Sequence, residues 1–315
     1  YFSEKVLSPE YIDDVYIGCV GQHLEQGKNI ARLSALIAGY PETIPGVTIN
    51  RLCASSLQAF NFASMAISSG SARAILAGGV EHMLHVPMAS CSDWHQELLN
   101  RYNFPFNNMG LTAENLAEIY KITRQSQDEF AVKSHQKAAK AQKEKVFEKE
   151  IVAIKVGEVW ISQDQGIRAD SSIESLANLK TAFKEGGTVT AGNSSQLSDG
   201  ASLTLLASES FCKEHSLKRK AKVLGSAVVG LDPCKMGLGP VPAIQKLLKA
   251  QNLTIKDIDS FELNEAFASQ TLACVSELKI PLEKINPSGG AIALGHPLGC
   301  SGTRLISTLI NNMEC

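Results

Sequence analysis

The feature that most constrains the fold is a regular alternation between short apolar runs and longer stretches with helical spacing. The runs VYIGCV, VTIN and ARAILAGG alternate with NIARLSALIAG and LQAFNFASMAIS, and IDSFELN is followed by ASQTLACVSEL. Strands that alternate with helices are typical of α/β proteins, in which helices cover the faces of a mainly parallel sheet. The sequence therefore predicts an α/β fold.

One helix in this pattern differs from the others. The segment from Ala54 to Ser69 is rich in alanine and serine and is apolar on nearly all sides. A helix that is apolar all round is usually buried between other layers. We therefore expect this helix to belong to a central helical layer.

A faint internal repeat suggests a duplication. Ile-Asp precedes an apolar run at 12–13 and again at 258–259, and Ile-Asn stands at 49–50 and again at 285–286. Such self-similarity is the sequence signature of a repeated structural unit. Two similar halves are therefore expected.

The composition changes between these halves. Aromatic residues and prolines gather at 94–106, and a long polar helix follows from Thr123 to Lys145. We expect its apolar stripe to pack inward, because small and apolar residues recur there at helical spacing. The stripe consists of Phe130, Ser134, Ala138 and Ala141.

These observations predict three parts along the chain. Residues 1–82 and 198–218 form the first half, residues 83–197 form an inserted loop domain, and residues 219–315 form the second half. The segment that returns to the first half, VTAGNSSQLSDGASLTLLAS, reads as a turn followed by a strand.

Charge and hydropathy exclude some classes of function. The 30 basic and 32 acidic residues give a net charge of −2, without a long run of one sign, so we expect no nucleic-acid partner. No apolar run reaches the roughly 18 residues of a membrane helix, and a secretory signal pattern is not seen in the first thirty positions. We therefore expect no membrane span and a cytoplasmic location.

The eight cysteines are scattered singly through the chain. Zinc sites usually place cysteines in closely spaced pairs, which this sequence lacks. We expect no metal, and buried thiols in a reducing compartment.

One of these cysteines stands in a special position. Cys53 follows the buried strand VTIN and opens the helix near Ala54. The positive end of a helix dipole lowers the pKa of a thiol and favours the reactive thiolate. Cys53 is therefore a candidate nucleophile, and the alternative is a small buried cysteine at a tight turn.

The glycine-rich segment NPSGGAIALGHPLGCSGTR contains a single histidine, His296. Small residues let another molecule approach the backbone, and the following proline restricts the histidine to an extended conformation. Neither the phosphate-binding GxxxxGK[ST] pattern nor a GxGxxG fingerprint is present. His296 is a candidate base in an open cavity, or a structural loop residue.

Asn264 lies in NEAFA, after the strand-like FEL and before a helix. Side chains at the carboxyl end of a strand are where α/β sheets place their sites. Asn264 is therefore a candidate site residue, with helix capping as the alternative or additional role.

Together, Cys53 in NRLCASS, Asn264 in NEAFA and His296 in GGAIALGHPLGCSGTR resemble the thiolase family in their order and motifs. The resemblance extends to GTVTAGNSSQLSDGA and GLDPCKMGLGPVPA. In detail, INRLCASSLQAF, GGVEHMLHVPM and MGLTAENLA are similar to the bacterial 3-ketoacyl-CoA branch, which forms the β subunit of the fatty-acid oxidation complex.

The resemblance implies a fold and a reaction. The fold is two βαβαβαββ halves stacked as a five-layer αβαβα sandwich, with a loop domain that holds CoA. The reaction is the cleavage of 3-ketoacyl-CoA by CoA, a step of fatty-acid β-oxidation. Cys53 attacks the C3 ketone, His296 takes the thiol proton and then helps hold the carbonyl oxygen, and Asn264 positions a water in that oxyanion hole.

The resemblance also implies a binding site for CoA, which is a substrate, so no resident cofactor is expected. Ser195 lies near the pantetheine and Arg168 near the adenine and phosphates, where a guanidinium is suited to bind. The apolar walls are Met109, Phe183 and Phe267.

Two departures keep alternatives open. The sequence begins at YFSEKVLSPE, without the family's first strand. Thiolases carry a second cysteine in a Cys-x-Gly loop, whereas this sequence stops at LINNMEC, and Cys315 lacks the following glycine. We expect that the sequence is part of a longer protein, the alternative being a CoA-binding or assembly subunit without catalysis. Acetoacetyl-CoA synthesis is a further alternative, although Asn108 stands where biosynthetic relatives have a histidine, which favours degradation.

The resemblance implies protein partners as well. Thiolases pair as homodimers or dimers of dimers. The bacterial relatives also bind an α subunit that carries enoyl-CoA hydratase and 3-hydroxyacyl-CoA dehydrogenase activities.

Overall fold

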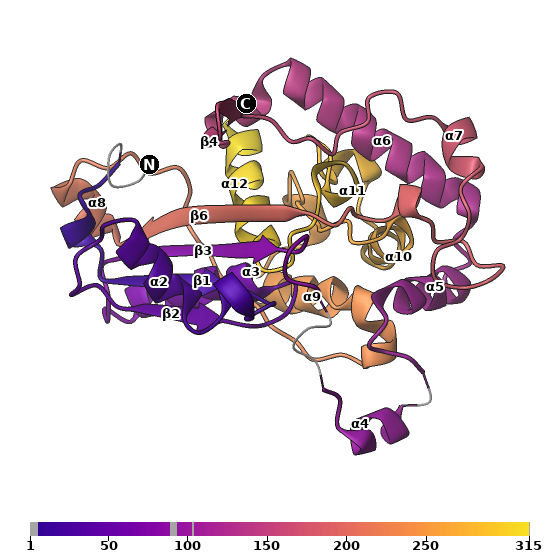
Figure 1. The fold of residues 1–315 in the computed structure, drawn as a ribbon, viewed down its shortest axis with the longest axis horizontal. Helices are drawn as coiled ribbons and strands as arrows, with labels where there is room; N and C mark the ends of the chain where they lie inside the picture. The colour runs from indigo at the N-terminus through magenta and orange to yellow at the C-terminus, as the bar shows by residue number, and fades with distance from the viewer. Residues whose placement is uncertain (1–5, 89–92, 103, 315) are drawn as a thin grey trace. The chain divides into compact units, whose positions relative to one another are not determined.

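The computed structural model describes residues 6–88, 93–102 and 104–314, and the chain divides into two compact units. The first unit comprises Tyr1–Ser92, Leu197–Val223 and Pro297–Ile310, and the second comprises Asp93–Gln196, Leu224–His296 and Asn311–Cys315. Figure 1 shows the elements of both units along the chain. Each unit is thus assembled from segments that lie far apart in the sequence.

The first unit contains a four-stranded sheet in the order β2-β1-β3-β6. The strands are β1 (Asp14–Gly18), β2 (Gly46–Ile49), β3 (Ala74–His82) and β6 (Asp199–Ala207). β1 pairs in parallel with β2 and β3, whereas β6 runs antiparallel to β3 and places Asp199 opposite His82. These strands confirm the predictions for VYIGCV, VTIN, ARAILAGG and the returning segment.

The helices of the first unit precede, connect or follow these strands along the chain. They are η1 (Pro9–Tyr11), η2 (Leu24–Gln26), α2 (Ile30–Ile37), α3 (Ser55–Ser68) and α8 (Glu209–Glu214), and α12 (Ser301–Met313) begins in this unit. Strand β3 shows how the sheet is covered on both faces, because its successive side chains alternate. Leu76 packs in one cluster with Ala31 of α2, and Ile75 packs in another with Ala63 of α3.

Helix α3 differs in part from the prediction of a helix buried all round. Its small residues face inward, whereas Leu57, Phe62 and Met65 are 38%, 42% and 51% exposed. The physical reason is close packing, because a Cβ on Gly18 would lie 2.3 Å from the backbone nitrogen of Ser56. The close approach requires small residues toward the sheet and leaves the larger apolar ones outside.

The second unit is mainly helical. Its helices are α4 (Gln96–Arg101), α5 (Met109–Ile119), α6 (Arg124–Lys143), α7 (Ile173–Ala177), α9 (Pro240–Gln251), α10 (Ala268–Leu278) and α11 (Ala291–Leu294). Its 3₁₀ turns are η3 (Val146–Lys149), η4 (Ala191–Asn193), η5 (Pro233–Leu238), η6 (Ile255–Asp257) and η7 (Leu282–Lys284), and β4 (Ile154–Val156) pairs with β5 (Val159–Ile161) as a hairpin. Helix α10 packs against α5, α6, α9 and η5 and is therefore the centre of the unit.

Two helix predictions are confirmed in this unit. ASQTLACVSEL forms α10, and the polar segment after Thr123 forms α6. In α6, Ser134, Ala138 and Ala141 are buried as expected, and Phe130 is half-buried.

The segment IDSFELN does not form the continuous strand that its pattern indicates. Within the described residues it makes one parallel bridge, between Phe261 and Ile285. The reason is that a side chain replaces the next backbone pairing. The amide of Asn286 accepts from the Leu263 nitrogen at 2.8 Å and donates to the Leu263 carbonyl at 2.8 Å.

In the part of the chain that the structure describes, no helix is both long and apolar enough to cross a membrane. The division into residues 1–82 with 198–218, 83–197 and 219–315 stays a prediction.

Candidate functional site

The candidate nucleophile follows a sharp turn between β2 and α3. Leu52 has φ +48°, in the left-handed region that costs free energy for a residue with a Cβ. The turn is fixed by two side chains, because Asn50 Oδ1 accepts from the Leu52 nitrogen at 2.9 Å and Ser55 Oγ accepts from the Arg51 nitrogen at 2.9 Å. Cys53 is thereby held in a defined place two residues before the first residue of α3.

Glycines let this turn lie directly against the sheet. A Cβ on Gly79 would lie 2.0 Å from the carbonyl oxygen of Gly299, and 2.7 Å from the Cβ of Ser56. No larger residue fits at this position without moving the backbone. The end of β3 therefore meets both the start of α3 and the segment that follows His296.

The pKa of the Cys53 thiol is raised, whereas the sequence analysis expected it to be lowered. Burial raises it to about 11, a backbone hydrogen bond partly opposes this, and the Glu81 carboxylate raises it further. The helix start was expected to lower the pKa, but the cost of burying a thiolate is larger. The resting group is therefore a neutral thiol, which needs a base to become a nucleophile.

Glu81 is a buried carboxylate that the sequence reasoning missed. It is 4% exposed, and its two oxygens accept from the backbone nitrogens of Val20 at 3.0 Å, Gly21 at 2.9 Å and Gly299 at 2.8 Å. The side chain of Gln26 donates to it as well. Because Gly299 lies three residues after His296, Glu81 fixes one side of the histidine loop.

Within the second unit the structure brings Asn264 and His296 together. Asn264 Nδ2 lies 3.3 Å from His296 Nε2, and the amide nitrogen donates to Nε2 in the tautomer that carries no proton there. Asn264 Oδ1 is buried and has no hydrogen-bond partner among the described residues, which suits an oxygen that binds water. Asn264 does not cap α10, whose N-cap is Phe267.

The other side of the histidine loop is fixed by Glu265, which the sequence reasoning also passed over. Glu265 accepts from Asn286 Nδ2 at 2.8 Å, from Ser134 Oγ at 2.6 Å and from the Ile292 nitrogen at 3.3 Å. His296 itself is buried, and it follows Gly295, whose φ of +94° only glycine adopts readily. The sequence signal that could have indicated Glu265 was its position directly after Asn264 in NEAFA.

Four of the five candidate CoA-binding residues lie in neighbouring structure. The rings of Phe183 and Phe267 meet edge to face at 5.9 Å, and a Cβ on Gly110, next to Met109, would lie 2.1 Å from the Phe183 ring. The nitrogen of Ser195 donates to the Ala266 carbonyl at 2.9 Å. The structure therefore gathers these residues along the segment that follows Asn264.

Arg168 lies on a separate loop that a buried histidine supports. Its backbone nitrogen donates to His135 Nδ1 at 3.1 Å. Burial lowers the pKa of His135, and the positive charge of Arg168 acts in the same direction, against a smaller opposing effect of Asp170. A neutral His135 is the form that can accept this hydrogen bond.

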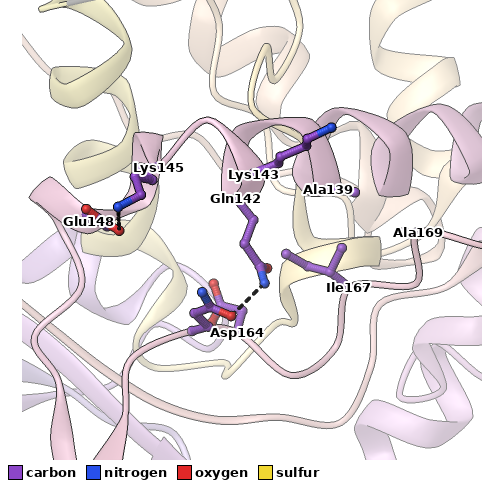
Figure 2. Close-up of a pocket in the computed structure, with 9 residues that line it drawn as sticks. Ala139, Gln142, Lys143, Lys145, Glu148, Asp164, Ile167 and Ala169 are labelled. Carbon is purple, nitrogen blue, oxygen red and sulfur yellow. Dashed lines mark hydrogen bonds and ion pairs between the residues drawn. The ribbon is translucent and has the colours of Figure 1, made fainter.

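A cavity of about 410 Å³ lies beside this loop in the second unit (Figure 2). Ile167 and Ala169, which flank Arg168, line it together with Lys143 and Lys145. Lys145 pairs with Glu148 at 3.4 Å, and Figure 2 marks this ion pair. Cys53, Asn264 and His296 are not among its lining residues. The cavity is therefore distinct from the Asn264–His296 pair.

Known proteins match the chain over nearly its whole length. The family model described as "Thiolase, N-terminal domain" matches residues 2–210, and "Thiolase, C-terminal domain" matches residues 217–315. The 3-ketoacyl-CoA thiolases of Aliivibrio fischeri and Serratia proteamaculans are each 51% identical over 317 residues, which cover 98% of this chain and 82% of the relative.

Solved structures agree with the sequence relatives. Human mitochondrial 3-ketoacyl-CoA thiolase has a TM-score of 0.90 at 38% identity, covering 99% of this chain and 83% of that one. The Bacillus anthracis acetyl-CoA acetyltransferase has a TM-score of 0.87 at 40% identity, covering 98% and 82%.

The chain belongs to the thiolase family and has the thiolase fold. The prediction of the family and of the fold class is thereby confirmed. Cys315, to which the sequence analysis assigned no role, lies outside the described residues.

Proposed function

We propose that the protein is a 3-ketoacyl-CoA thiolase of fatty-acid β-oxidation, an acyltransferase that converts 3-ketoacyl-CoA and CoA into acetyl-CoA and a shortened acyl-CoA. The observation that carries the proposal is the Asn264–His296 pair, in which an imidazole nitrogen lies 3.3 Å from the amide nitrogen of a side chain whose amide oxygen is buried. Relatives that are 51% identical bear the name of this activity.

The first half-reaction consumes the neutral thiol of Cys53. His296 takes the thiol proton, and the sulfur attacks the C3 ketone of the substrate. The bond between C2 and C3 then breaks, its electron pair stays on C2, and C2 takes up one proton to give acetyl-CoA. The shortened acyl group remains on the Cys53 sulfur as a thioester.

The raised pKa of Cys53 makes the base essential to this scheme. With a pKa of about 11, very little of the thiol is ionised at neutral pH, so proton removal must accompany the attack. His296 then holds the carbonyl oxygen together with a water on Asn264, which stabilises the negative charge that develops there.

In the second half-reaction the thiol of CoA attacks the thioester. It loses its proton as the acyl group moves to its sulfur, and Cys53 recovers a proton as the leaving group. CoA acts here as a substrate, and the scheme uses no resident cofactor.

CoA is bound by residues of the loop domain, 83–197, and by Phe267. Ser195 lies near the pantetheine chain, and Met109, Phe183 and Phe267 supply apolar walls. The contact between the Phe183 and Phe267 rings supports this assignment. Arg168 faces the adenine and phosphates. Its guanidinium is suited to phosphate, whereas the cavity beside its neighbours is lined by two lysines and by the carboxylates of Glu148 and Asp164, and so has no net positive charge.

Acetoacetyl-CoA synthesis is not favoured as the physiological role, because the relatives at about 50% identity are named for 3-ketoacyl-CoA. The acyl-chain preference discriminates the two activities. Efficient cleavage of substrates longer than acetoacetyl-CoA is expected for the degradative role.

The experiment compares wild-type protein with Cys53→Ala and with a matched control, Cys212→Ala, in which another free and partly buried cysteine is removed. We expect Cys53→Ala to abolish thiolysis and Cys212→Ala to keep it. Without CoA, 3-ketoacyl-CoAs of several lengths leave the acyl mass on the peptide that contains Cys53.

Thiolysis that persists in Cys53→Ala, or acyl mass on another cysteine, contradicts the mechanism. Wild-type protein that binds CoA but turns over none of these substrates supports a binding or assembly subunit instead.

The proposal extends to partners and location. The exposed apolar face of α3, with Leu57, Phe62 and Met65, supports a homodimer or a dimer of dimers, because large apolar side chains at one place favour association. Binding of a hydratase and dehydrogenase α subunit and a cytoplasmic location are expected as in the bacterial branch. Sedimentation of the purified protein tests the oligomer.

A further inference from the structure

We propose that Glu25, His82 and His85 form a binding site for a divalent transition-metal ion of the zinc class. The site lies entirely within the first unit, and none of its three residues is assigned to catalysis. It departs from the sequence expectation of no metal, which rested on the spacing of the cysteines.

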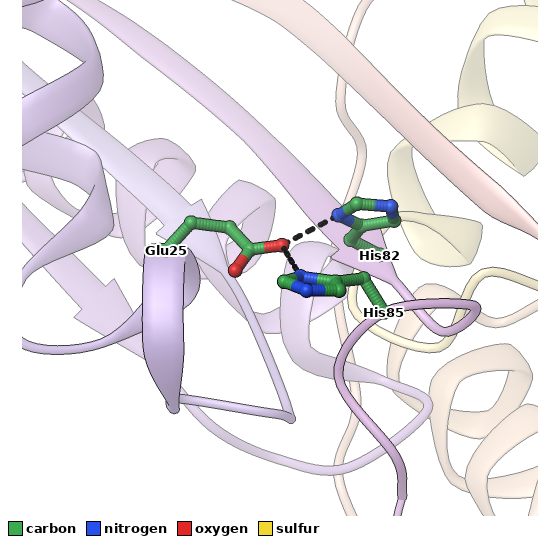
Figure 3. Close-up of side chains that lie close together, drawn as sticks. All are labelled: Glu25, His82 and His85. Atoms are coloured by element: carbon green, nitrogen blue, oxygen red, sulfur yellow. Dashed lines mark hydrogen bonds and ion pairs between the residues drawn. The ribbon is translucent and has the colours of Figure 1, made fainter.

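The three side chains converge on one point. Glu25 Oε1 lies 2.7 Å from His82 Nδ1 and 2.7 Å from His85 Nδ1. Figure 3 shows both imidazole rings turned toward the same carboxylate oxygen. One ligand atom from each residue lies within 4.8 Å of the others, which is the spacing that a single ion can bridge.

The ion takes the place of the two hydrogen bonds. Zinc binds imidazole nitrogen and carboxylate oxygen at about 2.0–2.2 Å, so tetrahedral ligands lie roughly 3.4 Å apart. The two N···O distances of 2.7 Å must therefore open by about 0.7 Å. All three side chains are more than one-third exposed, and they have room for this movement.

A neighbouring carboxylate completes the arrangement that metal-binding histidines usually have. A histidine that binds metal through one nitrogen generally directs the other toward a carboxylate, which fixes the ring and its tautomer. His82 Nε2 lies 3.6 Å from Asp199 Oδ2. Asp199 also accepts from the Leu84 nitrogen at 3.1 Å, which orients the turn that carries His85.

The backbone beneath the site is fixed by buried groups. Gln26, next to Glu25, accepts from the His82 nitrogen at 2.5 Å and donates to Glu81 at 3.1 Å. The nitrogen of Val86 donates to the His82 carbonyl at 2.9 Å and closes the turn around His85. The ligands therefore stand on a supported scaffold, as a selective site requires.

The charges and donor types suit the proposed ion. Two imidazoles and a carboxylate are typical ligands for zinc and its neighbours, whereas calcium and magnesium prefer oxygen alone. A glutamate carboxylate is ionised at neutral pH, so Glu25 offers a negatively charged oxygen. Together with Asp199 it neutralises a doubly charged cation.

Bound metal would join η2, the end of β3 and the following turn. An ion that binds only the folded state stabilises it by mass action. We therefore infer a stabilising site for the strand that carries Glu81, and not a catalytic one.

The test uses protein treated with EDTA and titrated with zinc chloride by calorimetry, with thermal unfolding measured in parallel. We expect wild-type protein to bind one zinc ion and to unfold at a higher temperature when zinc is present. His85→Ala and Glu25→Gln each remove one ligand and should weaken binding at least about tenfold, the lower bound found when even outer partners of metal sites are removed.

His23→Ala is the matched control, because His23 is an exposed histidine two residues from Glu25 and outside the cluster. It should bind zinc as the wild type does. All these variants keep every cysteine, so thiol binding contributes equally to each. Cobalt in place of zinc should give no strong sulfur-to-metal absorption.

Three results would overturn the proposal. They are an absence of one-to-one binding into the millimolar range, equal binding by His85→Ala and wild type, and a cobalt spectrum that shows thiolate ligands. Each would assign the cluster to hydrogen bonding between a carboxylate and two imidazoles alone. Unfolding measured without metal shows whether each variant is folded.

Discussion

Both units place an asparagine at the end of a parallel strand pairing, and they use it in different ways. Asn50 follows β2, is exposed, and supports the turn before Cys53 through bonds to Val20 and Leu52. Asn286 follows the Phe261–Ile285 bridge, is 1% exposed, and bonds to Leu263 and Glu265.

The difference shows two ways to hold a site residue. In the first unit the backbone hydrogen bonds of the β1–β2 pairing hold the strand that precedes Cys53, and Asn50 adds only bonds at the turn. In the second unit the side chain of Asn286 takes the place of a peptide group, and buried polar bonds do the rest. Because buried polar groups are costly when they lose a partner, the second unit should be more sensitive to single substitutions.

The largest expected effect comes from Asn286→Ala compared with Asn50→Ala. Removing the Asn286 amide leaves the backbone of Leu263 without these two partners in the interior and takes one hydrogen bond from the Glu265 carboxylate, which should lower the free energy of unfolding by about 3–5 kcal/mol. Asn50→Ala should cost only about 0.5–1 kcal/mol, because water replaces its bonds. Urea unfolding measures both, and equal losses would refute the comparison.

The next largest effect is expected for Glu81, which fixes one side of the histidine loop. In Glu81→Gln the amide nitrogen faces either the two donors of Val20 and Gly299 or those of Gly21 and Gln26, which should cost about 2 kcal/mol of stability. If Glu81 positions the loop, kcat should fall while KM for CoA changes little. No change in kcat of the folded enzyme would limit Glu81 to stability.

A smaller effect is expected in the reactivity of Cys53. Its pKa of about 11 leaves little thiolate at pH 8, so alkylation should be at least about tenfold slower than for a free thiol of pKa about 8.5, even after allowing for its greater nucleophilicity. The rate should rise as pH approaches 11. Mass analysis of the Cys53 peptide measures it, and rapid labelling at pH 7 would show a lowered pKa.

The raised pKa of Cys53 also makes the stability of the folded state depend on pH. The folded state holds the Cys53 proton more tightly than the unfolded chain does. Its contribution is therefore complete below about pH 8.5, the pKa of an unperturbed thiol, and is lost as pH rises toward 11.

The smallest effect is expected for Leu52→Gly. Leu52 is 65% exposed and has φ +48°, so glycine relieves strain and loses little packing. The greater freedom of glycine in the unfolded chain offsets part of the gain, and stability should rise by no more than about 1 kcal/mol. A clear loss in thermal unfolding would mean that Leu52 makes contacts that matter.

Much of the fold followed from periodicity. The alternating pattern predicted the four strands of the first unit and helices α2, α3, α6 and α10, because strand and helix periods differ and their burial patterns are local. The inward stripe at Ser134 and Ala138 was readable for the same reason. At Phe261 the pattern predicted a continuous strand that does not form, because nothing local reveals that the side chain of Asn286 substitutes for backbone pairing.

The candidate site was predicted less completely. Asn264 and His296 were chosen from motifs, and the structure places them in contact. Glu81, Glu265 and His135 were missed because their importance arises from burial and from partners distant in the sequence. The pKa of Cys53 was expected to fall because the effect of the helix start is visible in the sequence, whereas the larger effect of burial is not.

The bond from Gly299 to Glu81 spans 218 positions of the chain. Such a contact closes a very long loop, and loops of this kind form late because their entropy must be lost before the contact contributes. During refolding, helices and hairpins should therefore appear well before the segment after His296 reaches its place. Recovery of enzymatic activity should follow this last closure, so a chain with native secondary structure can remain inactive for some time.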